Sequence, residues 1–365
     1  MSRIVAVRTR AVSLPLHTTF TTALRSTDTT HAVLVEVEDS DGVVGHGEAP
    51  IVPVVTGEDE PGIRAVLTGP LRDAVLGAGT DDLADLADLL TRVADAVPGH
   101  PSAGAGVDLA LHDLAARRAG VPLAVLLCGR AGGVPTDVPT DVPTDVTVAA
   151  GDAARLAAAA CDRVADGFTA LKLKVGTDAA TDVARVRAVR SAVGPSVVIR
   201  LDANQGWMPD QAIRVIRELE DSGAGVELVE QPVPATDLDG LARVTAAVAT
   251  PVMADEAVFT LADLSAVIER GAATLVNVKL AKAGGLAAAR NQLLLAAAHG
   301  IGTMVGSMME TGVGVAAAGS LVAAVGTTLV CDLDAAWWLA DGAAPVSYDA
   351  GVLRLAGSPG LGRVR

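Results

Sequence analysis

Three acidic side chains each follow a short apolar run, and together they have the chemistry of a metal site. They are Asp202, Glu230 and Asp255. If the apolar runs are neighbouring parallel strands, the three carboxylates converge, and converging anions repel one another unless a cation lies between them. Oxygen ligands with no His or Cys nearby favour Mg²⁺ over Zn²⁺. Each acid alone is equally consistent with a cap on the following helix, but three in succession favour the metal site.

Lysines flank these acids along the chain. Lys172 and Lys174 lie two residues apart on an expected strand, so their side chains point the same way. Lys279 ends a later strand, on the far side of the acids. A lysine that lies among apolar strands and near a dication is expected to have a lowered pKa, which suits a base. One base on each face can remove and return a proton, whereas a single barrel lysine more often forms an ion pair or a Schiff base.

Asp332 and Asp334 form a second acidic pair, on one side of the last expected strand, Thr328–Asp334. Anions that are left over beside a satisfied metal site need a cationic partner, and the ammonium group of a substrate is a natural candidate. The alternative is that the two acids cap the next helix at Ala335, and the spacing alone does not decide between the two.

Short apolar strands and Ala-rich helices alternate through the rest of the chain and must position these residues. From Lys174 onward the expected strand ends recur every 24 to 28 residues. The ends lie near Ala150, Lys174, Asp202, Glu230, Asp255, Lys279, Ser307 and Asp332. Strands that alternate with helices predict a parallel sheet. Eight such units suit a (β/α)8 barrel, whose active face lies at the carboxyl ends of the strands, and a doubly wound sheet is the alternative.

The first third of the chain has an α+β pattern. Residues 3–48 alternate as strands around the turn Asp39–Gly42, and residues 62–128 have helical spacing. Three copies of Val-Pro-Thr-Asp then occupy residues 134–145, and their prolines exclude a helix. We interpret the copies as an exposed linker, away from the strand-end chemistry. The expected domains are an α+β domain at 1–130, a Pro-rich linker at 131–145, a barrel at 146–340 and a tail at 341–365.

Composition excludes several classes of function. A net charge of −15 argues against a nucleic-acid partner, which requires a basic face. The sequence shows no secretory signal and no apolar segment long enough to span a membrane. The three scattered cysteines suggest core thiols in a reducing compartment rather than disulfides. We therefore expect a cytoplasmic homo-oligomer that acts on a small molecule.

The motifs around these residues resemble the muconate-lactonising subgroup of the enolase superfamily, over nearly the whole chain. The resemblance lies in Gly45-His46-Gly47-Glu48-Ala49, Val107–Leu114, Lys172-Leu173-Lys174, Asp202–Trp207, Glu230-Gln231-Pro232, Ala254-Asp255-Glu256, Lys279–Gly285 and Pro359–Gly362. It implies a capping domain, formed by residues 1–130 and the C-terminal tail, over a modified barrel. It also implies Asp202, Glu230 and Asp255 as Mg²⁺ ligands, Lys174 and Lys279 as the acid/base pair, and Lys172 as an electrostatic partner of the substrate carboxylate.

Within that superfamily the Asp332–Asp334 pair is similar to the ammonium-binding signature of dipeptide epimerases. The resemblance implies a 1,1-proton transfer at the second residue of an L-Ala-L-Xaa dipeptide, through an enediolate. Arg25 matches an arginine that would pair with a glutamate side chain, and we place Thr147 and Ser307 among the substrate-binding residues. The alternatives are a muconate-type cycloisomerase or succinylbenzoate synthase of the same superfamily, a Schiff-base aldolase, and a barrel that binds metal without catalysis.

Overall fold

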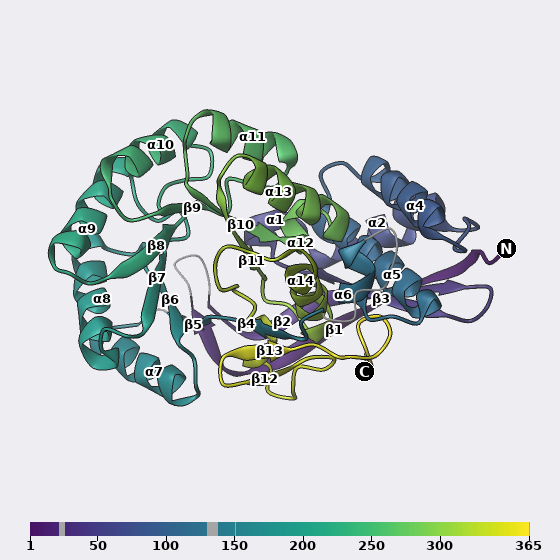
Figure 1. Cartoon of the computed structure of the whole chain (residues 1–365), viewed down its shortest axis with the longest axis horizontal. Helices are drawn as coiled ribbons and strands as arrows, with labels where there is room; N and C mark the ends of the chain where they lie inside the picture. Colours follow the sequence, from purple (N-terminus) through teal and green to yellow (C-terminus); the bar gives the residue numbers. More distant parts are fainter. Residues whose placement is uncertain (22–25, 130–137, 150, 365) are drawn as a thin grey trace.

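The computed structural model describes residues 1–21, 26–129, 138–149 and 151–364, and it has two lobes (Figure 1). The smaller lobe begins with an antiparallel sheet of order β1-β2-β3. Its strands are β1 (Ile4–Thr21), β2 (Ser26–Asp39) and β3 (Val44–Pro50). Six helices follow: α1 (Pro53–Thr56), α2 (Glu60–Thr68), α3 (Pro70–Val75), α4 (Leu83–Ala96), α5 (Pro101–Ala119) and α6 (Leu123–Cys128).

Helix α5 packs closely against the sheet because glycines face it. A Cβ atom on Gly45 would lie 2.1 Å from the carbonyl oxygen of Ala110, and one on Gly47 would lie 2.0 Å from that of Gly106. Alternate residues of β2 are buried on the same side, as a sheet with one face against helices requires. The α+β character expected for this part of the chain is confirmed.

The larger lobe is a curved parallel sheet with helices outside it (Figure 1), as the sequence predicts. Seven strands follow one another in sequence order. They are β5 (Val146–Val148), β6 (Ala170–Lys174), β7 (Val198–Asp202), β8 (Val226–Glu230), β9 (Val252–Ala254), β10 (Leu275–Lys279) and β11 (Gly302–Gly306). The helices are α7 (Ala153–Ala165), α8 (Ala179–Val193), α9 (Pro209–Asp221), α10 (Leu238–Ala247), α11 (Leu261–Glu269), α12 (Leu280–Ala283), α13 (Leu286–Ala298) and α14 (Gly312–Val325).

The expected eighth strand is not a regular strand. Isolated bridges join Asp332 to Gly306 and Cys331 to Thr144, and the short helix η1 (Ala335–Trp338) follows. The segment thus lies between β11 and the residues that lead into β5, where the eighth strand of a barrel belongs. The prediction of a strand over Thr328–Asp334 is wrong in detail, because its backbone pairs with each neighbour through an isolated bridge rather than a continuous ladder.

The third Val-Pro-Thr-Asp copy, residues 142–145, is part of the folded core. Strand β4 (Asp141–Pro143) pairs with β13 (Val352–Arg354), which pairs with β12 (Ser347–Asp349). Val142 is 2% exposed and Asp145 is fully buried. The expectation of an exposed linker is therefore wrong for this copy, while the first copy, at 134–137, lies outside the described residues.

The C-terminal tail contacts both lobes. The backbone N–H of Leu361 donates to Asp113 Oδ1 at 2.6 Å, and Arg117 Nη2 donates to the Gly362 carbonyl at 2.6 Å. Since both partners lie on α5, the tail meets the small lobe as expected.

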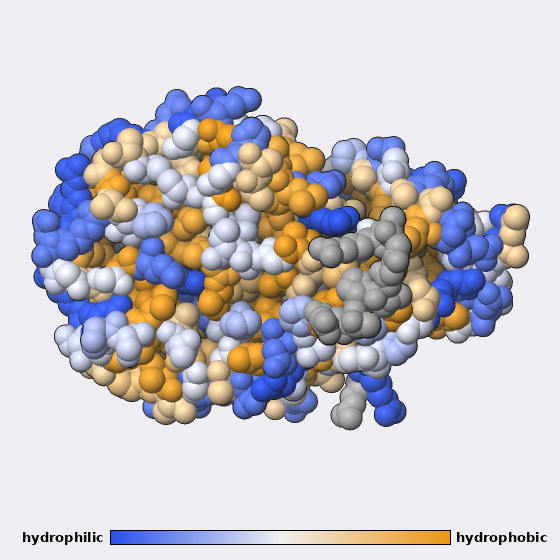
Figure 2. Space-filling model, viewed as in Figure 1, coloured by the Kyte–Doolittle hydropathy of each residue, from blue (hydrophilic) through white to orange (hydrophobic). Residues whose placement is uncertain are grey.

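The outer surface of the large lobe is hydrophilic. Figure 2 shows hydrophilic residues gathered at the outer edge of the large lobe, over α8 and α9. In the described part of the chain no helix is long and apolar enough to cross a bilayer.

The three cysteines differ in burial. Cys331 is a buried thiol as expected, but Cys161 is exposed and Cys128 only partly buried, so the expectation of three core thiols is wrong for these two.

Candidate active site at the strand ends

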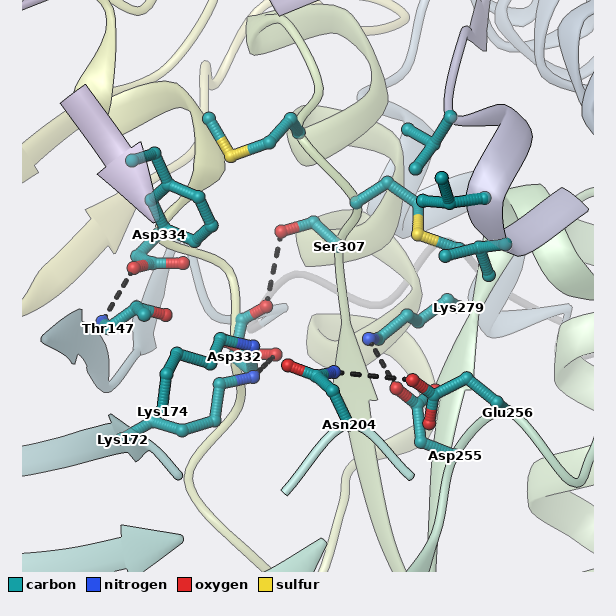
Figure 3. Close-up of a pocket in the computed structure, with 16 residues that line it drawn as sticks. Thr147, Lys172, Lys174, Asn204, Asp255, Glu256, Lys279, Ser307, Asp332 and Asp334 are labelled. Carbon is teal, nitrogen blue, oxygen red and sulfur yellow. Dashed lines mark hydrogen bonds and ion pairs between the residues drawn. The ribbon is translucent and has the colours of Figure 1, made fainter. Parts of the chain in front are cut away.

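A pocket opens at the carboxyl ends of the barrel strands, beneath the small lobe (Figure 3). The charged groups all line its barrel side, together with two methionines, and apolar groups line the side of the small lobe. The barrel contributes Thr147, Lys172, Lys174, Asn204, Asp255, Glu256, Lys279, Ser307, Met308, Met309, Asp332 and Asp334, and the small lobe contributes Phe20, Val52, Val54 and Val55.

The three predicted metal ligands come from adjacent strands. Asp202 pairs in register with Glu230 across β7 and β8, and Asp255 directly follows β9. Asp202 and Glu230 are fully buried beneath the pocket wall, and Asp255 is 2% exposed. Burial raises the pKa of Glu230 to about 8; Lys172 opposes this shift, and the negative charges of Asp202 and Asp255 add to it. A cation at this point would relieve the mutual repulsion.

The donor set fits a hard cation, although the acids do not form a ready-made cage. Within the described ranges no group of three His, Cys, Asp or Glu side chains is arranged closely enough to hold a metal ion. Two of the three acids are paired with lysines, Asp202 with Lys174 and Asp255 with Lys279. Glu230 Oε2 is nevertheless buried without a hydrogen-bond partner, and Lys172 Nζ lies 3.6 Å away. An oxygen in this state suits Mg²⁺, which prefers carboxylate ligands.

Figure 3 shows the two predicted bases, Lys174 and Lys279, on opposite sides of the pocket. Lys174 Nζ donates to Asp202 Oδ2 at 2.6 Å, and Lys279 Nζ donates to Asp255 Oδ2 at 2.7 Å. Burial lowers the pKa of Lys279, but the negative charges of Asp255 and Glu230 outweigh burial and raise it. The lowered pKa was expected for a lysine beside a bound dication, and that expectation stays a prediction.

The second acidic pair is held by groups from three elements. Lys172 Nζ contacts Asp332 Oδ2, and Ser307 Oγ donates to the Asp332 carbonyl at 3.2 Å. Asp334 Oδ2 accepts the backbone N–H of Thr147 at 2.8 Å and Trp338 Nε1 at 3.0 Å. Asp334 precedes helix η1, but its side chain makes no capping hydrogen bond there. Helix capping is therefore not the role of Asp334.

Three polar residues of the site were not predicted. Asn204 Nδ2 donates to Glu256 Oε1 at 3.2 Å, and Lys282 Nζ lies 2.6 Å from Asp255 Oδ1. Burial raises the pKa of Glu256 to about 7, and the charges of Asp255 and Asp202 add to this shift. The rarity of lysine was the signal that could have pointed to Lys282. The chain has only four lysines, and all four are buried in or beside this pocket.

Arg25, the predicted partner of a glutamate side chain, lies outside the described residues. Phe20, which precedes it on β1, lines the pocket. Val52, Val54 and Val55 line it from the start of α1, and nothing in the sequence pattern marked them in advance. All the other predicted site residues meet in or directly beneath the pocket.

Comparison with known protein families matches both lobes. Residues 4–128 match the mandelate racemase / muconate lactonizing enzyme N-terminal domain, and residues 155–364 match the enolase C-terminal domain-like family. The chain belongs to the enolase superfamily. The fold class predicted from the sequence, a modified barrel with a capping domain, is that of this superfamily.

Individual members of the superfamily are similar over almost their full length. The L-Ala-D/L-Glu epimerase of Bacillus subtilis is 39% identical over 99% of this chain and 96% of its own. The hydrophobic dipeptide epimerase of Enterococcus faecalis is 36% identical over 92% of each chain.

Solved structures of these enzymes superpose closely on the chain. A substrate-liganded complex of the Bacillus subtilis epimerase has a TM-score of 0.92, at 39% identity, and covers 99% of this chain and 98% of its own. The Enterococcus faecalis dipeptide epimerase complexed with Mg and L-Leu-L-Tyr has a TM-score of 0.90, at 35% identity, with 99% of both chains covered.

Proposed function

We propose that this enolase-superfamily member is a Mg²⁺-dependent dipeptide epimerase that inverts the second residue of L-Ala-L-Xaa dipeptides. The observation that carries the proposal is that Lys174 and Lys279 lie on opposite sides of one pocket (Figure 3), each paired with one of the buried carboxylates. Two bases that face each other across a cation site suit a reaction in which a proton leaves one face of a carbon and returns to the other. The names of the similar enzymes point to the same reaction.

The reaction requires charge stabilisation beside the substrate carboxylate. Removing an α-proton puts a second negative charge onto a group that is already anionic, and a Mg²⁺ ion held by Asp202, Glu230 and Asp255 would stabilise that charge electrostatically. Lys172, which lies 3.6 Å from Glu230 Oε2, is placed to add positive charge at the same end of the substrate.

The two lysines then exchange roles across the planar carbon. One lysine, in its neutral form, takes the α-proton from its side of the substrate. The opposite lysine, in its ammonium form, delivers a proton to the other side, which inverts the configuration. The ion pairs with Asp202 and Asp255 hold both Nζ atoms, and both lysines line the pocket in which the substrate would bind.

The dipeptide ammonium group would bind at Asp332 and Asp334, which line the same pocket. Asp332 and Asp334 are both buried, and the cation nearest to Asp332 is Lys172. A substrate ammonium would be an additional counter-ion for these two carboxylates, of which Asp332 already contacts Lys172. Cytoplasmic location and homo-oligomeric assembly stay predictions from the sequence.

Exchange of the α-proton in D₂O tests the proposed reaction. With Mg²⁺, L-Ala-L-Xaa dipeptides should lose the α-proton of the second residue and form the L,D epimer, while the α-proton of alanine is kept. An absence of exchange across a broad dipeptide library would rule the proposal out.

Two carboxylate substitutions separate epimerisation from the cycloisomerase alternative. Asp332→Asn combined with Asp334→Asn should reduce dipeptide turnover by about 100-fold or more, because the ammonium loses both charge-assisted partners. A cycloisomerase substrate has no ammonium group, so its turnover should change little. Turnover of such a substrate by the wild-type enzyme, without dipeptide exchange, would favour the alternative.

A further inference from the structure

The segment that carries Asp332 and Asp334 has no regular strand ladder to fix it. On the β11 side backbone bonds hold it at two places. Thr328 and Leu329 N–H donate to the Thr303 carbonyl at 3.1 and 3.2 Å, and farther along Asp332 N–H donates to the Val305 carbonyl at 3.0 Å while its carbonyl accepts Ser307 N–H at 2.9 Å. On the opposite side the neighbour is the third Val-Pro-Thr-Asp copy. What this copy contacts therefore decides how firmly the acidic pair is placed.

Thr144 makes contacts on both sides of Asp332. Its Oγ1 accepts the backbone N–H of Leu333 at 2.8 Å and lies 3.3 Å from the Cys331 carbonyl. The backbone N–H of Asp145 donates to the same Cys331 carbonyl at 2.8 Å. Since Thr144 is only 3% exposed, no water is at hand to replace these bonds.

The Asp145 carboxylate extends this contact across the barrel through a buried arginine. Arg200, on β7, donates from Nη1 to Asp145 Oδ2 at 2.8 Å and to the Val330 carbonyl at 2.7 Å. Its Nε donates to Glu227 Oε2 at 2.6 Å. Arg200 is 1% exposed, so the pair ties the segment before Asp332 to a metal-ligand strand without solvent screening.

The second copy has the same residues and none of these contacts. Thr140 and Asp141 are exposed, and the Asp141 carboxylate pairs with Arg354 on β13 at 2.6 Å instead. In the described residues only the copy that directly precedes β5 reaches the acidic segment. Position, not sequence, separates the two copies.

We infer that Thr144 and Asp145 are positioning residues of the ammonium site, acting through the backbone that carries Asp332 and Asp334. The inference rests on the proposed function. A carboxylate that shifts by about 1 Å loses much of its charge-assisted contact with a bound ammonium, so the supporting bonds bear on substrate recognition. The repeat is then part of the substrate site rather than a linker.

The two copies supply matched variants for the test. Thr144→Val and Asp145→Asn remove the supporting groups with little change in shape, and Thr140→Val and Asp141→Asn make the same changes in the exposed copy. The probes are an L-Ala-L-Xaa dipeptide that the wild-type enzyme accepts and its propionyl-Xaa analogue, in which hydrogen replaces the ammonium. Calorimetric Kd and D₂O exchange are measured for both probes.

Loss of ammonium recognition is the expected result. Thr144→Val and Asp145→Asn should lower the ratio of dipeptide to propionyl-Xaa affinity by about tenfold. The Kd for Mg²⁺ should stay within about twofold of wild type, and the exposed-copy variants should match wild type in every measurement. General damage to the fold would weaken both probes equally and leave the ratio unchanged, which would overturn the inference.

The binding and exchange measurements test separately the proposed epimerase reaction and the positioning role of Thr144 and Asp145. If wild-type protein binds the dipeptide more tightly than propionyl-Xaa but exchanges no α-proton, the proposed reaction fails while the binding ratio still tests Thr144 and Asp145. If wild-type protein binds both probes equally, or if Thr140→Val acts like Thr144→Val, the positioning role is wrong.

Discussion

At the scale of single residues, the site holds its charges in buried pairs. Lys174 pairs with Asp202 and Lys279 pairs with Asp255. Buried charges are tolerated only when they are paired, so each lysine also stabilises the acid beside it. A bound cation and a bound substrate carboxylate would redistribute these partners. The same side chains can therefore serve the fold and the reaction.

Substituting one lysine should separate proton removal from proton return. We expect Lys279→Met to lower epimerisation by about 1,000-fold, because one of the two proton-transfer groups is lost. Lys174 should still exchange the α-proton of one epimer of the dipeptide in D₂O. Lys174→Met should give the complementary result, with exchange of the other epimer only.

Proton NMR of each epimer in D₂O measures this, with circular dichroism as the control for folding. Exchange of the same epimer by both variants would contradict the assignment of the lysines to opposite faces.

Some residues of the site could be predicted from the sequence and others could not. Asp202, Glu230 and Asp255 could be predicted because each follows an apolar run at a regular interval. The raised pKa of Lys279 could not be predicted, because it depends on an ion pair whose geometry appears only when two strand ends meet. Lys282 could not be predicted from the strand ends, because it lies on α12, beyond the end of β10.

At the scale of elements, β3 of the small lobe and the turn before α14 meet through two buried glutamates. Glu48 accepts the backbone N–H groups of Thr311 and Gly314 at 2.7 and 2.8 Å. Glu310 lies beside it and accepts the Met308 N–H at 2.8 Å. Burial raises the pKa of Glu310 to about 8, and the negative charge of Glu48 adds to the shift.

This pair predicts a pH dependence of stability. The unfolded chain releases the Glu310 proton near pH 4.5, whereas the folded chain keeps it to about pH 8. Stability is therefore lost as pH rises from about 4.5 to about 8. Glu310→Gln keeps the acceptor for Met308 and has no proton to lose, so at pH 9 its Tm should exceed that of wild type by about 3 °C, and at pH 4 the two should agree.

Thermal melts across this pH range measure the difference, and Glu269→Gln on the exposed surface of α11 is the control. A constant Tm difference at all pH values would contradict the pH-linked origin.

The sequence pattern predicted the regular strands of the barrel but not the conformation of its eighth segment. The seven regular strands were predictable because their apolar residues recur between helices. The eighth segment was not, because Thr144 and Arg200 fix it through side chains that lie far away in sequence. The three Val-Pro-Thr-Asp copies are identical in sequence. The sequence therefore could not show that, of the two copies that the structure describes, only residues 142–145 enter the barrel wall.

At the scale of the whole molecule, the site forms only where both lobes meet. Phe20 and Val54 from the small lobe complete a pocket whose charged groups all come from the barrel. A ligand that binds at this junction, and not to the unfolded chain, should stabilise the entire fold by mass action.

Mg²⁺ should therefore raise the melting temperature. At a concentration of about 100 times its Kd, we expect an increase of roughly 2 to 5 °C. Asp255→Asn should lose this increment, because it removes one of the three ligand charges, while Asp221→Asn on the exposed end of α9 should keep it. Differential scanning calorimetry with Mg²⁺ and with EDTA measures the effect, and equal melting temperatures for wild-type protein in both would contradict a folded-state cation site.

The distribution of lysine gives the molecule one more property. All four lysines, Lys172, Lys174, Lys279 and Lys282, are at most 7% exposed, and the surface takes its positive charge from arginine. Amine-reactive reagents will accordingly modify these four side chains slowly in the folded protein and rapidly once the protein unfolds, so that lysine labelling reports on unfolding.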